Sequence, residues 1–186
     1  MPTNKLKEWI KVKIPDDSLN LILKYVNDND HKWNAGGLMV DGSKKEIRDC
    51  NVSVVKDEQI NNYIFGNLIK ANNSYWKFDL KSMIPTQFIT YKTDQHYDWH
   101  DDWHVHEGDA ARKLSMTLVL NDEYEGGEFQ FKRVSYENDE GVEIKTLKLE
   151  KGDILIFPSI MTHRVLPVTS GVRKVFVAWA CGPQWR

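Results

Sequence analysis

Cysteine is scarce in this chain of 186 residues, and its scarcity excludes two classes of protein. Cys50 and Cys181 are the only cysteines, and they lie far apart with no Cys-x-x-Cys pair. A closed structural zinc site usually contains thiolates, and a disulfide framework needs several closely spaced cysteines. We therefore expect neither, and the scarcity favours a reducing, cytoplasmic location.

Long hydrophobic runs and an excess of one charge are also lacking. No segment approaches the roughly 18 consecutive apolar residues of a membrane-spanning helix, and the first residues show no apolar secretory core. The 25 basic and 27 acidic residues give a formal net charge of −2, which provides no global attraction to nucleic acid or to an anionic membrane. We expect neither as a partner, and the sequence leaves the oligomeric state open.

What is present is a change of pattern along the chain. Before residue 84, apolar residues recur at helical spacing in a segment that starts at about Pro15 and in another from about Asp57 to Ala71. The rest consists of short extended runs separated by turns. The predicted strands are Thr86–Lys92, Leu114–Leu120, Glu128–Lys132, Glu143–Leu149, Ile154–Phe157 and Arg173–Ala180. This order predicts an α+β fold, a double-stranded β-helix (jelly-roll) barrel with the N-terminal helices packed on its outside.

Two histidines and a carboxylate indicate a metal site. His100 and Asp102 are two positions apart in an aromatic-rich segment typical of a strand, so their side chains should share one face. His163 follows a buried run that Pro158 ends. Two imidazoles and one carboxylate leave positions open on an octahedral ion, as in non-haem Fe(II) oxygenases. A catalytic zinc site with a bound water fits the same residues.

A lone arginine lies on an otherwise apolar strand. Arg173 alternates with two valines and Trp179, so all four should share one face. The segment 169–171 predicts a turn, and His163 and Arg173 should flank a hairpin-like connection. A buried guanidinium needs an anionic partner, and bidentate recognition of a carboxylate would supply one. The sequence therefore predicts a carboxylate-binding residue beside the metal.

A smaller polar face is predicted on the strand Leu114–Leu120. Ser115 and Thr117 share one side of this strand, while leucines and a methionine share the other. The hydroxyl groups either line the pocket or meet solvent, because antiparallel sheets often keep one wet face.

Together these residues resemble the Fe(II)/2-oxoglutarate-dependent dioxygenases, in particular the prolyl 4-hydroxylase-like branch. Family members carry a Tyr-x-x-Gly-x-x-Tyr-x-x-His-x-Asp segment, then a Gly-Gly-Glu hairpin, a distal histidine and a basic residue ten positions later. The matching residues are Tyr91, Tyr97, His100, Asp102, Gly126, Gly127, Glu128, His163 and Arg173. Asp94 stands where the family usually has glycine, which bears on the loop conformation because glycine is favoured at unusual backbone angles. The resemblance covers residues 86–183.

The length and the absence of a linker predict a single domain over residues 1–186, with a helical part at 1–83 and a core at 84–186. By the resemblance this domain is a dioxygenase whose core would hold the metal and co-substrate. His100, Asp102 and His163 would bind Fe(II) and form the catalytic centre. Arg173 and Tyr91 would hold 2-oxoglutarate, in a pocket to which Ser115 and Thr117 are also assigned. Dioxygen would be the oxidant, and ascorbate is considered as a reductant.

The implied reaction is hydroxylation of an unactivated C–H bond, with succinate and CO2 as co-products. A proline residue in a peptide or protein is the leading substrate, and a free amino acid or another small molecule is the alternative. Trp179, Tyr97 and Trp103 are the expected substrate contacts.

Two rival interpretations come from other classes of protein. A His-x-His pair such as His104 and His106 is also what a cupin uses to bind metal in a similar barrel. The acidic residue that should follow such a pair is poorly placed here, at Glu107 or Asp109. The second rival is a catalytically silent binding module on the same fold, against which the complete set of predicted ligands argues.

Overall fold

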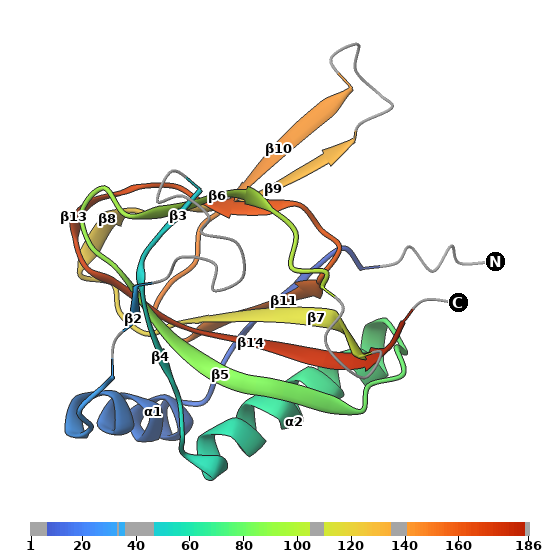
Figure 1. Ribbon diagram of the computed structural model, residues 1–186, viewed down its shortest axis with the longest axis horizontal. Coiled ribbons are helices and arrows are strands. Elements are labelled where there is room, and N and C mark those ends of the chain that lie inside the picture. The colour runs from blue at the N-terminus through green and yellow to red at the C-terminus, as the bar shows by residue number, and fades with distance from the viewer. Residues whose placement is uncertain (1–6, 33, 36–46, 105–109, 135–140, 185–186) are drawn as a thin grey trace.

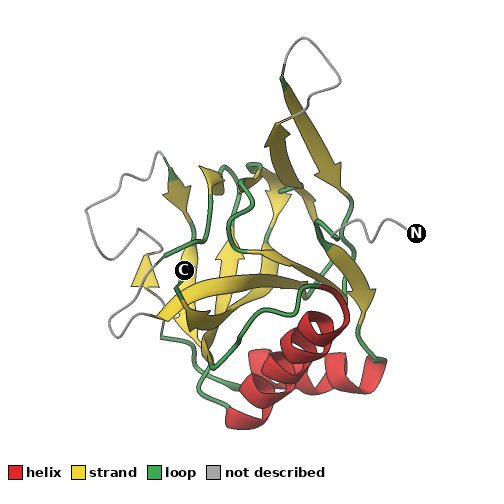
Figure 2. Cartoon of the chain, turned by 90° about the vertical axis from the view of Figure 1, so that its right-hand side faces the viewer, coloured by secondary structure: helices red, strands yellow, loops and turns green. Residues whose placement is uncertain are grey.

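Two antiparallel sheets face each other, and two helices cover the outer face of the larger sheet (Figure 1). The structure is a computed structural model, and it describes residues 7–32, 34–35, 47–104, 110–134 and 141–184. Figure 2, turned by 90°, shows both helices again on one side of the strands. This arrangement agrees with the predicted α+β jelly-roll fold.

The sheets are built from strands that lie far apart in the sequence. In the larger sheet the order is β1 (Ile10–Lys13), β11 (Asp153–Pro158), β7 (Ala110–Val119), β14 (Arg173–Pro183), β5 (Ser82–Tyr91), β4 (Asn51–Val54) and β2 (Asn34–Ala35). In the smaller sheet it is β10 (Val142–Leu147), β9 (Phe129–Val134), β12 (His163–Val165), β6 (His96–His100) and β3 (Arg48–Asp49). A third, two-stranded sheet pairs β13 (Val168–Gly171) with β8 (Tyr124–Gly126).

The helices form where the apolar spacing predicts them. α1 (Asp16–Asp28) buries Leu19, Ile22 and Val26 against the sheet. α2 (Glu58–Tyr75) begins after Asp57, whose carboxylate accepts a hydrogen bond of 3.0 Å from the backbone N–H of Ile60. It runs four residues past the predicted end at Ala71. No helix in the described part of the chain is long and apolar enough to cross a membrane.

The larger sheet has two different faces, and β14 shows both. Phe176, Ala178 and Ala180 pack with the helices in the outer core. The alternate residues, from Arg173 to Trp179, line a cavity between the sheets, as the strand alternation predicted. Burial of the outer core holds the helices in place, at about 1.5–3 kcal/mol for each large side chain. The inner face is thereby left to form the site.

Three local predictions differ from the structure. Residues 1–83 are not helical alone, because β1 to β4 also lie in this part and join both main sheets. Residues 169–171 form part of β13 and pair with β8, so β12 and β14 are not a hairpin but lie in different sheets. The aromatic-rich strand β6 ends at His100, so Asp102 lies outside it.

Candidate active site

The three predicted metal ligands converge between the two sheets. His100 is the last residue of β6, and His163, the first residue of β12, lies opposite it in the strand pairing. One Asp102 carboxylate oxygen is 3.8 Å from His100 Nε2, and the other is 3.5 Å from His163 Nε2. One donor atom from each residue lies within 4.8 Å of the others. Such a spacing suits a single divalent cation.

Asp102 lies beyond the end of β6, so strand alternation does not determine the direction of its side chain. Its backbone N–H donates a hydrogen bond of 2.9 Å to the carbonyl oxygen of Ser159, which follows β11. Behind it, the hydroxyl groups of Ser115 and Ser159 are 2.9 Å apart and fully buried. Ser115, predicted at the co-substrate pocket, therefore lies beside Asp102 and supports its carboxylate. Backbone contacts between neighbouring strands, rather than the strand face, orient this carboxylate.

Hydrogen bonds and ring stacking orient both imidazoles. The Nδ1 atom of His100 is 2.7 Å from the carbonyl oxygen of Asp98, and that of His163 is 2.8 Å from the carbonyl oxygen of Met161. A carbonyl only accepts, so each Nδ1 carries the proton and each Nε2 keeps its lone pair. The ring of Tyr97 stacks on His100 with 3.4 Å between centroids. Both histidines are therefore arranged to bind a metal through Nε2.

The electrostatics favour neutral imidazole and charged carboxylate. Burial, assisted by the nearby His163, lowers the pKa of His100 to about 3, although Asp102 acts in the opposite direction. Burial alone would raise the pKa of Asp102, but the two histidines and the Ser115 hydroxyl hold that pKa below its ordinary value. These are the protonation states that metal binding requires.

We expect the metal-free protein to lose stability as the pH falls below about 6.5, the ordinary histidine pKa. The lowered pKa of His100 means that the unfolded chain binds the proton more readily than the folded chain between about 6.5 and about 3. Stability is therefore retained above this window and lost within it. Thermal melts with a chelator, from pH 7.5 to 4.5, should show a shallower loss for His100→Gln. Equal slopes for both proteins would contradict this assignment.

Arg173 and Tyr91 lie side by side at the inner end of the site. Arg173 begins β14, pairs with Tyr91 of β5 and is only 1% exposed. Its guanidinium carbon is 5.5 Å from the centroid of the Tyr91 ring. Within the described residues Arg173 makes no ion pair, and its Nε has no hydrogen-bond partner. Burial raises the pKa of Tyr91, so its phenol is a neutral donor. Together they form a binding site for a carboxylate.

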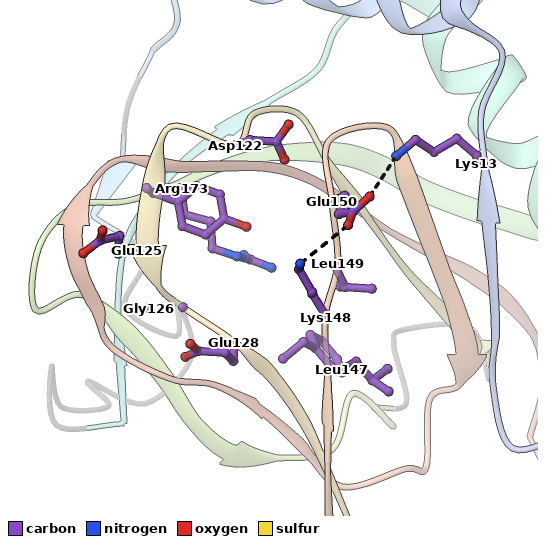
Figure 3. A pocket seen from close by; sticks show the side chains of 13 residues that line it. Lys13, Asp122, Glu125, Gly126, Glu128, Leu147, Lys148, Leu149, Glu150 and Arg173 are labelled. Atoms are coloured by element: carbon purple, nitrogen blue, oxygen red, sulfur yellow. Dashed lines mark ion pairs between the residues drawn. The ribbon is translucent and has the colours of Figure 1, made fainter.

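A narrow cavity of about 40 Å³ connects these groups. Of the predicted site residues, Tyr91, Tyr97, His100, Asp102, Thr117, His163, Arg173 and Trp179 line it. Arg173 also lines a larger cavity of about 620 Å³ (Figure 3), into which its guanidinium points. On the rim of that cavity Glu150 lies between Lys13 and Lys148, with Nζ-to-carboxylate distances of 3.9 and 3.8 Å. Arg173 can therefore be approached from both cavities.

Other predicted residues lie away from the narrow cavity. Trp103 is 42% exposed and lines neither cavity described above. His104 is exposed and does not join the three-residue donor group, while His106 lies outside the described residues. In contrast, Arg48 of β3 lines the cavity and was missed, because a two-residue strand carries no alternation signal.

Two residues of the family motif, Asp94 and Gly127, have positive φ angles in turns beside the site. Asp94 has φ 69°, which is the left-handed conformation. Aspartate tolerates this conformation better than most residues, which explains why it can stand where the family usually has glycine. Gly127 has φ 65°, and a Cβ atom there would lie 2.8 Å from Cδ of Arg173. The Gly-Gly turn thus leaves room for the Arg173 side chain.

Comparison with known proteins places this geometry in context. A sequence model described as the 2OG-Fe(II) oxygenase superfamily matches residues 86–181. A PKHD-type hydroxylase of Thermosynechococcus vestitus is 30% identical over 171 residues, which cover 88% of this chain and 71% of that protein. A PKHD-type hydroxylase of Synechococcus is 39% identical over 97 residues, but the match spans 50% of this chain and 40% of that protein.

Solved structures share the fold at lower sequence identity. A prolyl-4-hydroxylase of Pseudomonas putida has a TM-score of 0.71 at 19% identity, with 96% of this chain and 94% of that chain covered. A prolyl hydroxylase of Trichoplax adhaerens, in complex with a peptide fragment of the hypoxia inducible factor oxygen degradation domain, has a TM-score of 0.74 at 16% identity, with 96% and 84% covered.

Proposed function

Because the chain belongs to the 2OG-Fe(II) oxygenase superfamily, and is thus a 2-oxoglutarate-dependent dioxygenase, we propose that it hydroxylates a proline residue in a peptide or protein. Succinate and CO2 would be the co-products. The observation that carries the proposal is the convergence of two imidazoles and a carboxylate within 4.8 Å, beside a buried arginine that has no acidic partner among the described residues. No such pairing of features is expected of a structural zinc site.

The donor set fits ferrous iron. His100, Asp102 and His163 would hold the metal through two neutral nitrogens and one oxygen, which leaves three positions of an octahedron free. When bound, the iron and 2-oxoglutarate supply the oxidising chemistry with dioxygen, and the protein supplies placement and exclusion of water. Asp102 and His163 are buried, and the His100 side chain is only 12% exposed, so solvent is restricted at the metal.

The co-substrate would be held from its far end. Arg173 would bind the distal carboxylate of 2-oxoglutarate through two charge-assisted hydrogen bonds, and the phenol of Tyr91 would donate a third. Thr117, which lines the same cavity, offers a hydroxyl along the path toward the metal. These three side chains come from β14, β5 and β7, adjacent strands of the larger sheet, so the sheet itself sets their spacing.

Aromatic residues support a prolyl substrate. Tyr97 and Trp179 line the cavity at the metal, and flat rings suit contact with the apolar faces of a pyrrolidine. The relatives are named as hydroxylases, and two structural neighbours are described as prolyl hydroxylases, one of them with a peptide.

The iron and co-substrate sites on which the proposal depends are tested by adding 2-oxoglutarate to the Fe(II)-loaded protein without oxygen. We expect a visible metal-to-ligand charge-transfer band, because a keto acid chelated to ferrous iron absorbs there. The zinc-loaded protein is the matched control, since it can bind the same ligands but cannot give this band. If iron binds and the band does not appear, the dioxygenase assignment of these residues is wrong.

A further inference from the structure

Three arginines near the candidate centre form no salt bridge within the described residues, although Asp102 attracts Arg112 at longer range. Arg48, Arg112 and Arg173 each have a buried Nε atom that makes no hydrogen bond. Arg173 is accounted for by the distal carboxylate of 2-oxoglutarate in the proposed function. The other two are partly buried and have weaker partners: Arg48 hydrogen-bonds the Cys50 side chain, and Arg112 is attracted by Asp102 without a salt bridge to it. A guanidinium in such a place favours a direct anionic partner.

The Arg48 side chain lies close to the metal ligands. It lies opposite Tyr97 in the pairing of β3 with β6, and it lines the same narrow cavity. Its guanidinium carbon is 4.8 Å from the centroid of the Tyr97 ring. The Tyr97 ring in turn stacks on the imidazole of His100, with 3.4 Å between the two centroids. Arg48 therefore carries a positive charge one ring away from His100.

Arg112 approaches from the opposite sheet. Its backbone N–H, on β7, donates a hydrogen bond of 3.2 Å to the carbonyl oxygen of His104. The guanidinium lies 4.2 Å from the ring of Trp179, which lines the cavity. Burial raises the pKa of Tyr97 to about 12, while Arg48 and Arg112 both act to lower that pKa. The phenol of Tyr97 is thus within electrostatic reach of both guanidinium groups.

The formal charges of the loaded centre do not cancel. The three arginines contribute three positive charges, and Asp102 contributes one negative charge. Ferrous iron and the 2-oxoglutarate dianion are equal and opposite, so two positive charges remain. Arg48, over the ring of Tyr97, and Arg112, over the ring of Trp179, are the two cations to which no ligand has been assigned. A substrate with a negative group beside its reacting carbon would neutralise them.

We propose that the substrate carries a carboxylate close to the carbon that is hydroxylated, and that Arg48 and Arg112 bind this carboxylate at the mouth of the site, near the phenol of Tyr97. This inference rests on the proposed function and narrows its substrate class. A planar carboxylate matches the guanidinium fork. The carboxylate belongs either to the target residue itself or to a neighbouring acidic side chain.

The experiment compares acids with their uncharged counterparts. The Fe(II)-loaded protein with 2-oxoglutarate is titrated without oxygen with N-acetylproline and with N-acetylprolinamide. A second pair, N-acetyl-Asp-Pro-amide and N-acetyl-Asn-Pro-amide, places the carboxylate on a side chain. Binding is followed by calorimetry and by the change in the charge-transfer band. We expect the acid of one pair to bind about 10- to 100-fold more tightly, because hydrogen bonds to charged groups contribute about 1.5–3 kcal/mol. The pair that discriminates identifies the source of the carboxylate.

Variants then connect this preference to the two arginines. Arg48→Gln and Arg112→Gln should each remove most of the preference for the acid, while the 2-oxoglutarate concentration for half-formation of the band stays within about twofold. Arg133→Gln is the matched control, because Arg133 is exposed and paired with Glu8 and Glu143. The titrations of the unmodified protein remain decisive even if a variant does not fold.

The possible failures are distinguishable. Absence of the band in the unmodified protein would contradict the proposed function itself. If the band forms but neither acid binds better than its amide, including the case in which no probe binds, the inference is overturned, while the iron and 2-oxoglutarate sites of the proposed function stand. Weakened 2-oxoglutarate binding in Arg48→Gln or Arg112→Gln, with the preference for acids retained, would also overturn it.

Discussion

Replacing Asp102 with alanine should abolish 2-oxoglutarate turnover and lower the affinity for Fe(II) by more than about 100-fold. Loss of residues that merely support a metal ligand already costs about 10- to 100-fold in affinity or activity, so loss of a ligand should cost more. The structure adds a reason, because Asp102 is the only carboxylate in the donor group of the described residues. Calorimetric titration of Fe(II), with succinate formation as a second readout, measures both effects.

Asp101→Ala is the matched control for this experiment. Asp101 carries the same charge one residue earlier, but it is exposed and its carboxylate accepts a hydrogen bond from the backbone N–H of Trp103 instead. It should retain Fe(II) binding and turnover. Coupled turnover that survives in Asp102→Ala would place the centre elsewhere. His104→Ala then becomes the decisive variant, since the rival cupin-type site depends on that residue.

Replacing Arg173 with glutamine should raise the 2-oxoglutarate requirement by about 100-fold or more, with Fe(II) affinity unchanged. Truncating one partner of a buried, hydrogen-bonded charge pair costs about 2–5 kcal/mol, and each 1.4 kcal/mol is tenfold. Arg173 is 1% exposed, so water cannot replace the lost contacts. The charge-transfer band, titrated with 2-oxoglutarate, measures the requirement directly.

The neighbouring Lys174→Gln provides the control, because its side chain lies on the other face of β14. Arg173→Lys should recover part of the affinity through its charge but not the bidentate geometry. An unchanged midpoint in Arg173→Gln would mean that the distal carboxylate is bound by other residues. Circular dichroism of each variant separates this outcome from loss of the fold.

Much of the fold was predictable because periodicity reports burial. The apolar spacing of Leu19, Ile22 and Val26 predicted α1, and alternation from Arg173 to Trp179 predicted which face of β14 lines the cavity. Both patterns exist because one side of each element packs against the core. His163 could be proposed as the third ligand from its place after a buried run, but the pairing of β6 with β12 that brings it opposite His100 leaves no local signal.

The missed features depend on contacts between distant segments. Arg48 lies in a strand of two residues, and its place beside Tyr97 follows from pairing with β6. Asp102 is oriented by a backbone hydrogen bond to Ser159, which follows a different strand. The stretch at residues 169–171 has the composition of a turn, yet β8 is available to pair with it. In each case tertiary structure determined what local propensity could not.

Gly141 and Gly127 have nearly the same φ angle, but they differ in the space that a side chain would find at each position. Gly141 has φ 64°, and a Cβ atom added there would meet nothing within 4 Å, whereas at Gly127, with φ 65°, a Cβ atom would meet Arg173 at 2.8 Å. At the first position a substitution costs backbone strain of about 1–2 kcal/mol. At the second, the same strain comes with displacement of the arginine assigned to the co-substrate. Among related sequences, substitutions should therefore be tolerated at the position of Gly141 and selected against at the position of Gly127, even where both variants still fold.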